Sequence, residues 1–223
     1  MKKVLFIVAL LALVWVLPIA RASAPFDGTI IALDAGHGGG ESGAVGYCLG
    51  VPVAEEDVNR AVRAELKSLL DGVAASVFEV PQLASRRDRV QAAEDAHADV
   101  LISIHHNGSS NTSTDYTQSF VTQKNDKELA LPIQSALAAA LGLPDRGIKS
   151  DGYGMTVYGS LPGVLTEAYF ITDTDEACDF LGARARVSAE ARAMFDGLAT
   201  YFLSRSDGGG GSCSPDAEKQ GKC

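Results

Sequence analysis

The chain has 223 residues, 46% of them hydrophobic and 21% charged, a composition that suits one good-sized domain with its own apolar core. Its 28 acidic and 19 basic residues give a formal net charge of −9. That balance argues against a nucleic-acid-binding protein, which needs a basic surface to release counterions from phosphate, and against attraction to an anionic membrane.

Residues 1–24 have the pattern of a secretory signal peptide. Two lysines precede an apolar run over residues 4–20, and small residues occupy positions 22–24. Because this run is slightly shorter than the roughly 20 residues that a spanning helix needs, an uncleaved membrane anchor is the weaker alternative. We expect cleavage after Ala24 and export to the periplasm or the cell wall, with no membrane contact afterwards. The loss of three basic residues raises the excess of acidic residues to 12.

The remaining chain alternates between predicted strands and predicted helices. A short β-rich segment runs into a Gly-rich loop that extends to about Pro52, and apolar residues then recur at helical spacing. The predicted strands cover residues 29–33, 76–80, 100–105, 116–122 and 164–170, and the predicted helices cover residues 55–71, 85–97, 126–141 and 183–204.

This alternation predicts a single α/β domain over residues 25–206, with a mostly parallel, twisted sheet flanked by helices on both faces. Residues 207–223 then form a Gly-rich linker and a polar tail. Four cysteines in an exported protein are expected to pair. The sequence leaves all three connectivities open, and the plausible pairs are Cys213 with Cys223 and Cys48 with Cys178. No Cys-x-x-Cys spacing is present, which argues against a cysteine-ligated zinc site.

Two of the four histidines follow predicted strands. His37 lies in the Gly-rich loop after the first strand, and His105 ends the strand at residues 100–105. In open α/β sheets, ligands bind beyond the carboxyl ends of the strands, so we expect these two side chains to converge. The alternative for either histidine is a structural role as a capping or core residue.

A catalytic zinc site takes three protein ligands, commonly including a carboxylate, and leaves one position for water. Glu55 and Glu56 both stand at the start of the helix predicted over residues 55–71. At about 100° per residue, the apolar face of this helix lies within about 60° of Glu55, whereas Glu56 points about 100° away, toward solvent. Glu55 is therefore the better candidate for a third ligand of one Zn²⁺ ion beside His37 and His105, and the alternative for it is a simple N-terminal charge that suits the helix dipole.

Glu167 interrupts an otherwise apolar stretch, the strand predicted at residues 164–170. A carboxylate in a buried strand costs free energy unless it is paired or functional. Near a metal ion it can act as the general base that takes a proton from water. The alternative is a structural ion pair with Arg89 or Arg146.

Five motifs occur in order along the chain: Leu33-Asp-Ala-Gly-His37-Gly-Gly, Glu55-Glu-Asp-Val-Asn59, Arg89-Val, Ala98-Asp-Val-Leu-Ile-Ser-Ile-His105-His-Asn107 and Pro162-Gly-Val-Leu-Thr-Glu167-Ala-Tyr-Phe170. With them, residues 29–204 resemble the zinc-dependent N-acetylmuramoyl-L-alanine amidases of the AmiC type, the amidase 3 family. The resemblance implies a single α/β domain, zinc ligands at His37, Glu55 and His105, and a catalytic glutamate at Glu167. It also implies a peptidoglycan substrate, cleaved at the amide between N-acetylmuramic acid and L-alanine of the stem peptide.

The chain departs from the family pattern at several positions. His106 stands where the family often has a small residue, and we expect it to pack beside the site or support it. Asp173 replaces a frequent asparagine, which predicts altered hydrogen bonding nearby. Only about 20 residues separate His105 from the helix predicted at residue 126, too few for the helix that blocks the zinc ion in regulated members. We therefore expect activity without an activator, and no separate wall-binding domain.

The resulting hypothesis is that a zinc-activated water attacks the amide carbonyl, while Glu167 takes its proton and passes it to the departing L-alanine nitrogen. Asp34, Asn107 or backbone carbonyls are expected to orient the histidine rings. We expect a monomer that binds peptidoglycan and no nucleic acid. The alternative functions are a zinc peptidase acting on stem-peptide bonds and a non-catalytic module that binds the cell wall.

Overall fold

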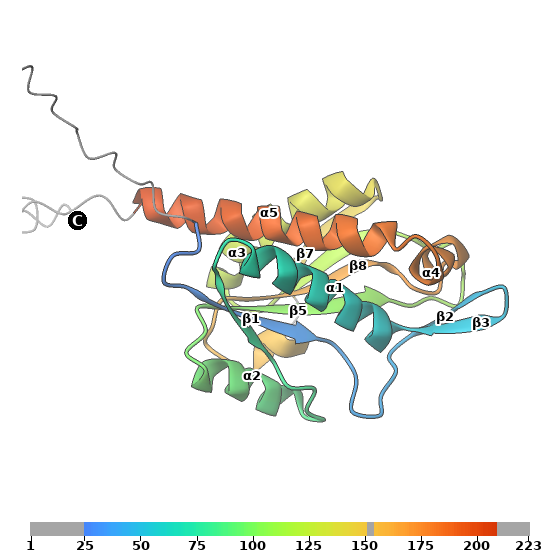
Figure 1. Cartoon of the computed structure of the whole chain (residues 1–223), viewed down its shortest axis with the longest axis horizontal. Coiled ribbons are helices and arrows are strands. Elements are labelled where there is room, and N and C mark those ends of the chain that lie inside the picture. The colour runs from blue at the N-terminus through green and yellow to red at the C-terminus, as the bar shows by residue number, and fades with distance from the viewer. Residues whose placement is uncertain (1–24, 151–153, 209–223) are drawn as a thin grey trace, which may run out of the picture.

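The computed structural model describes residues 25–150 and 154–208, and Figure 1 shows one sheet with helices on both faces. Six strands form this sheet in the order β4–β1–β5–β8–β6–β7. Neighbouring strands run parallel except for β6 and β8, which pair antiparallel. The predicted α/β fold with a mostly parallel sheet is confirmed. In chain order the strands are β1 (Ile30–Ala35), β4 (Ser76–Glu79), β5 (Val100–Asn107), β6 (Thr117–Val121), β7 (Asp145–Ser150) and β8 (Gly163–Phe170).

The two faces of the sheet carry different helices (Figure 1). A larger apolar core lies under α1, α3 and α5, and a smaller one lies under α2 and the short 3-10 helix η1. Because successive side chains of a strand point to opposite faces, Ile102 and Ile104 of β5 enter the larger core, whereas Leu101 enters the smaller one. The bounds are α1 (Glu55–Asp71), α2 (Arg86–Asp95), α3 (Lys124–Leu141), η1 (Gly154–Val157) and α5 (Ala185–Gly208).

A β-hairpin lies inside the segment predicted as a Gly-rich loop. Its strands, β2 (Val45–Cys48) and β3 (Val51–Ala54), pair antiparallel. The turn residues Leu49 and Gly50 have φ angles of 49° and 84°, and the common two-residue hairpin turns require positive φ at both positions. Leucine is an unusual residue there, which is why the sequence predicts a loop.

Three further short elements are absent from the sequence-based prediction: β7, η1 and α4 (Thr174–Leu181). None of the helices in the described ranges has the length and apolar character needed to cross a membrane. The predictions for residues 1–24 and for pairing of Cys213 with Cys223 lie outside the described residues. The domain boundaries therefore stay predictions.

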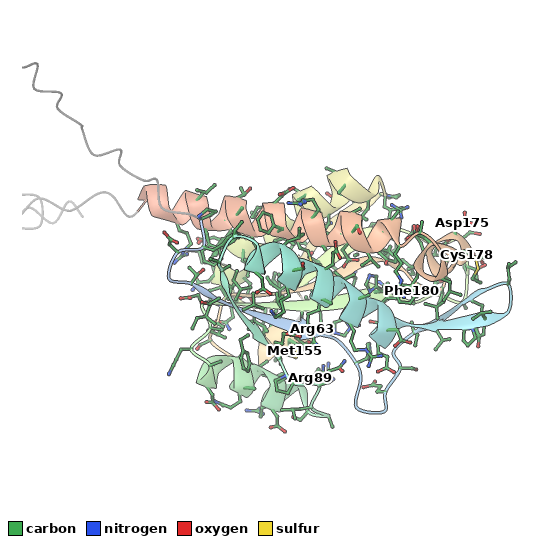
Figure 2. All side chains as sticks on the ribbon, in the orientation of Figure 1. Arg63, Arg89, Met155, Asp175, Cys178 and Phe180 are labelled. Atoms are coloured by element: carbon green, nitrogen blue, oxygen red, sulfur yellow. A yellow bond between two sulfur atoms is a disulfide. The ribbon has the colours of Figure 1, made fainter. Side chains whose placement is uncertain are left out.

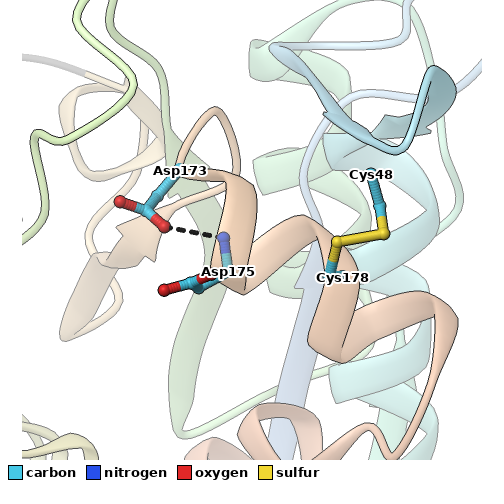
Figure 3. The surroundings of a disulfide bond; sticks show 4 residues. All are labelled: Cys48, Asp173, Asp175 and Cys178. Atoms are coloured by element: carbon cyan, nitrogen blue, oxygen red, sulfur yellow. Dashed lines mark hydrogen bonds between the residues drawn. A yellow bond between two sulfur atoms is a disulfide. The ribbon is translucent and has the colours of Figure 1, made fainter.

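A disulfide joins Cys48, at the end of β2, to Cys178 in α4 (Figure 3), one of the pairings that the sequence leaves open. The bond links residues 130 positions apart. Asp173 caps α4, because its Oδ1 accepts a hydrogen bond from the backbone N–H of Asp175 at 2.9 Å. The hairpin is thus held against α4 by a covalent bond, and Asp173 has a local role in the same region.

Replacing both Cys48 and Cys178 with serine should lower the free energy of unfolding by about 2–5 kcal/mol. A crosslink between distant residues removes much of the conformational freedom of the unfolded chain. Urea unfolding under oxidising conditions measures the change. The matched control replaces Cys213 and Cys223, which are ten residues apart and should change the stability less. A Cys48/Cys178 variant as stable as the wild type would contradict this prediction.

Candidate active site

The carboxyl ends of β1 and β5 lie side by side, because the two strands pair in parallel. His37 follows β1, His105 lies near the end of β5, and Glu55 is the first residue of α1. Oε1 of Glu55 is 3.1 Å from Nε2 of His37 and 3.0 Å from Nδ1 of His105. The potential ligand atoms of these residues all lie within 4.8 Å of one another. The three residues predicted as zinc ligands therefore meet at one point.

The donor set of this cluster suits zinc. Two imidazole nitrogens and a carboxylate oxygen are donors that zinc takes in catalytic sites, where a fourth position stays open. Among residues 25–150 and 154–208, no second group of three or more such side chains lies close enough to hold a metal ion. Glu55 is only 4% exposed, as its place on the apolar helix face predicts, whereas Glu56 is partly exposed.

Electrostatics keeps Glu55 ionised. Burial by itself raises the pKa of this carboxyl, but hydrogen bonds from His105, from His37 and from the N–H of Ala44 outweigh burial and hold the pKa well below its usual range. The hydrogen bond to Glu55 in turn raises the pKa of His37, although burial acts in the opposite direction. A permanent negative charge thus lies between two imidazoles, as a divalent cation requires.

Two glycines leave room for the cluster. A Cβ atom on Gly36 would lie 2.2 Å from the His105 ring, and one on Gly43 would lie 2.4 Å from Oε2 of Glu55. Gly43 also has a φ of 68°, which side-chain-bearing residues rarely adopt. The Gly-rich loop is therefore shaped by the close approach of the histidine and carboxylate side chains.

Arg89 forms hydrogen bonds to the loop that carries His37. His37 has a φ of 62°, a conformation that costs a non-glycine residue about 1–2 kcal/mol. The guanidinium projects from α2 toward the sheet (Figure 2) and donates to the carbonyls of His37 and Ala35 at 2.6 and 3.1 Å. It also donates to Oδ1 of Asp34 at 3.0 Å. The predicted alternative of an ion pair between Arg89 and Glu167 is therefore wrong, because the guanidinium already donates hydrogen bonds to β1 and to the loop that follows it.

Glu167 lies on β8 directly opposite His105 in the parallel register, so both side chains point to the same face of the sheet. Its Oε2 is buried and has no hydrogen-bond partner within the part of the chain that the structure describes. Arg146, the other predicted partner, instead lies over the ring of Tyr116 at 4.7 Å. Burial, and then the negative charge of Glu55, raise the pKa of Glu167 well above its usual range. The carboxyl group thus has no partner at Oε2, and its surroundings favour the protonated form.

The predicted support of the histidine rings by Asp34 or Asn107 is wrong. Asp34 accepts hydrogen bonds from side chains of α2 and β5, and Oδ1 of Asn107 accepts from the next backbone N–H. The exposed Glu41 lies near the His37 ring, with Oε1 3.6 Å from Nδ1. Glu41 is not among the residues predicted from the sequence, and its spacing of four residues from His37 is the only signal that points to it.

His106 supports the cluster from the other face of the sheet. Its buried ring places Nδ1 2.7 Å from Oδ1 of Asn59 and Nε2 2.9 Å from Oε2 of Glu190. The two ring nitrogens therefore join Asn59 of α1 to Glu190 of α5 through the buried imidazole. The backbone N–H of His106 also donates to Oε1 of Glu55 at 3.1 Å. The expectation that His106 packs beside the site and supports it is confirmed.

Glu190 is a buried acid in α5 that is not among the residues predicted from the sequence. It lies in α5 with Val187, Ala191 and Met194, which are all buried in the larger core. An acid within an apolar helical stripe is the same signal that identifies Glu55 on α1. Applied to the last helix, that test finds Glu190.

A cavity of about 450 Å³ opens over the cluster. His37, Glu55, His105 and Glu167 line it together with Glu41, Arg86 and Met155. Residues 108–123, which follow β5, contain β6 and no helix, as the short spacing to α3 predicts. None of these residues except Gly108 lines the cavity.

Comparisons with known proteins agree with this arrangement. The uncharacterized protein YqiI of Bacillus subtilis (strain 168) is 36% identical over 197 residues, which are 83% of this chain and 90% of YqiI. N-acetylmuramoyl-L-alanine amidase LytC from the same strain is 34% identical over 189 residues, 80% of this chain but only 36% of LytC.

The fold also matches a solved amidase domain. The catalytic domain of CwlV, an N-acetylmuramoyl-L-alanine amidase from Bacillus (Paenibacillus) polymyxa var. colistinus, aligns with a TM-score of 0.72 and 26% identity. The alignment covers 78% of this chain and 98% of that domain. The model of the amidase 3 family, described as N-acetylmuramoyl-L-alanine amidase, matches residues 31–200. On these grounds, the chain belongs to the amidase 3 family of N-acetylmuramoyl-L-alanine amidases.

Proposed function

We propose that this protein hydrolyses the amide bond between N-acetylmuramic acid and L-alanine of the peptidoglycan stem peptide. One observation carries the proposal: His37, Glu55 and His105 meet in a cavity that also holds the unpartnered carboxylate of Glu167, in a chain of the amidase 3 family. A metal-binding donor set beside a free base, open to solvent, is the combination that metal-assisted amide hydrolysis needs.

Nε2 of His37, Oε1 of Glu55 and Nδ1 of His105 would hold one zinc ion. When bound, zinc supplies Lewis-acid polarisation of the amide carbonyl and makes water more acidic. The backbone N–H groups of Ala44 and His106 each hold one oxygen of Glu55 in place. The carboxylate therefore presents a fixed edge to the ion rather than rotating between positions.

Glu167 would move the proton of the reaction. Its Oε2 takes a proton from the attacking water as the carbon–oxygen bond forms, and returns it to the nitrogen of L-alanine as the carbon–nitrogen bond breaks. No described protein group competes for this oxygen, and burial makes it a stronger base than an exposed carboxylate. The stem peptide leaves with a free amino end on L-alanine.

We further propose that the protein works after export, in the periplasm or the cell wall, as a monomer of the AmiC type that needs no activator. The disulfide between Cys48 and Cys178 supports export, because such bonds persist in oxidising compartments. The absence of a helix in residues 108–123 supports activity without an activator, since this segment carries nothing that could plug the cavity.

Digestion of purified sacculi with and without a metal chelator tests the function. The protein should release intact stem peptides with L-alanine at the amino end, identified by mass, and chelation should stop the release until zinc is added back. Fragments cut within the stem would instead favour the zinc peptidase. Binding to sacculi with no release at all would favour the wall-binding module.

Replacing Glu55 with glutamine should remove most of the bound zinc, while the same change at Glu56 should leave it bound. Loss of an anionic ligand should weaken the metal more than the roughly 10- to 100-fold that loss of a supporting residue costs. Glu56 is the matched control, because it is the next residue of the same helix and faces away from the cluster. Metal analysis of the dialysed variants measures this, and equal zinc content would contradict the ligand set.

A further inference from the structure

One cation in the wall of the active-site cavity has no partner. Arg86, the first residue of α2, lines the cavity and is exposed. No described residue makes a hydrogen bond, an ion pair or a ring contact with it. The other arginines of the same turn are occupied, since Arg87 lies 5.2 Å over the ring of Tyr158 and Arg89 clamps the His37 loop. Arg86 is therefore free to meet a ligand.

The acidic residues around the cavity do not supply that partner. Asp34 pairs with Arg89 at 3.0 Å, Glu41 lies beside His37, and Glu55 lies between the two histidines. Glu167 also lines the cavity, but its buried Oε2 has no partner among the described residues, so it does not pair with Arg86. The positive charge of Arg86 thus stays uncompensated in a chain that is acidic overall.

Helix stability does not explain Arg86 either. The positive end of the helix dipole favours acidic residues in the first turn and disfavours cations there. Asp88 satisfies this preference in α2, whereas Arg86 opposes it. An arginine here costs local stability, and a role toward a ligand would offset that cost.

We propose that Arg86 binds a free carboxylate of the stem peptide and so sets the preference of the enzyme for carboxylate-bearing over amidated stems. This inference rests on the proposed amidase function, since it places the peptide in the same cavity as the metal cluster. The planar guanidinium presents paired N–H donors that match the two oxygens of a carboxylate, but not an uncharged amide. Stem peptides carry such carboxylates on the residues after L-alanine, and each is open to amidation.

The test compares soluble muropeptides that differ only in amidation. One arm amidates the α-carboxylate of the second stem residue, and another amidates the side-chain or α-carboxylate of the third residue, which identifies the carboxylate that is bound. For the wild type, kcat/KM should fall about 10- to 100-fold on one of these amidated substrates, mainly through KM, as loss of a charge-assisted hydrogen-bond pair predicts.

Arg86→Gln should bring the ratio of kcat/KM between the free and amidated substrates close to one. Arg86→Lys should keep part of the preference, because lysine carries the positive charge but lacks the paired N–H donors of the guanidinium. Arg87→Gln is the matched control on the same turn, and should keep the wild-type ratio. Binding of the released stem peptide to Glu167→Gln protein, with and without Arg86→Gln, gives a second readout that needs no turnover.

The two proposals fail in different ways. A wild type that releases stem peptides at equal kcat/KM from all the substrates would overturn the role of Arg86 and leave the amidase function standing. A wild type that releases no stem peptide from any substrate would overturn both. An unchanged substrate ratio in Arg86→Gln, with the wild-type preference present, would assign that preference to another residue and overturn the inference.

Discussion

Replacing Glu167 with glutamine should lower kcat on muropeptides by about 10²- to 10⁴-fold, the range that general acid–base catalysis contributes. Glutamine fills nearly the same volume but cannot accept and return a proton at neutral pH. Because Glu167 lies outside the predicted ligand set, the variant should keep its zinc. Steady-state kinetics and metal analysis of the same preparation measure both effects.

Measuring the melting temperature of Glu167→Gln distinguishes a loss of catalysis from a loss of folded structure. Oε2 of Glu167 is buried without a partner, and burial and the charge of Glu55 disfavour its ionisation. An acid whose folded pKa is raised loses stabilising protonation as the pH rises, so metal-free Glu167→Gln should gain stability relative to the wild type as the pH rises above the usual range of a carboxyl pKa. Glu65→Gln, at an exposed site on α1, is the control: it should change neither kcat nor the pH dependence of the melting temperature. Full turnover by Glu167→Gln would refute the assigned proton transfer.

Replacing His106 with alanine should lower the free energy of unfolding by about 3–5 kcal/mol. Glu190 is completely buried, its Oε2 is held by His106, and its Oε1 has no hydrogen-bond partner among the described residues. Removal of the imidazole therefore leaves the buried Glu190 side chain without a hydrogen-bond partner among the described residues, and Asn59 loses a hydrogen bond as well. Urea unfolding at neutral pH measures the loss.

A double variant tests the cause of this loss. His106→Leu combined with Glu190→Met removes both polar groups and roughly conserves the volume, so it should recover most of the stability. Glu190→Gln alone should cost less than His106→Ala, because it leaves the imidazole in place and keeps a polar group beside Nε2. A cost below about 1 kcal/mol for His106→Ala would mean that the pair contributes little to the fold.

The meeting of His37 and His105 was predictable because parallel strands end at the same edge of a sheet, and both residues follow such strands. Glu55 was predictable because helical geometry puts it on the apolar face. The period of a strand or of a helix is visible directly in the sequence. At these three positions the residue type and that period indicate the same location of the side chain.

The contacts of Arg89 and Glu41 were not predictable by the same route. Both depend on where a loop without periodicity places its carbonyls and side chains, and the bend at His37 needs a positive φ that no residue type there announces. The β2–β3 hairpin was missed for a related reason, since its turn begins with a leucine. The bonds of Arg89, moreover, join residues 52 to 55 positions apart, which no local pattern displays.

Two neighbouring residues of strand β5 face opposite sides of the sheet and make different contacts. His105 faces the α2 side and the carboxylate of Glu55, while His106 faces α5 and the buried Glu190. Insertion or deletion of a single residue within this strand would exchange the two faces, placing the His106 ring in the cavity and the His105 ring in the core. The length of β5 is therefore fixed by two unrelated requirements at once, and changes in length near the site should be tolerated only in the loop at residues 109–116.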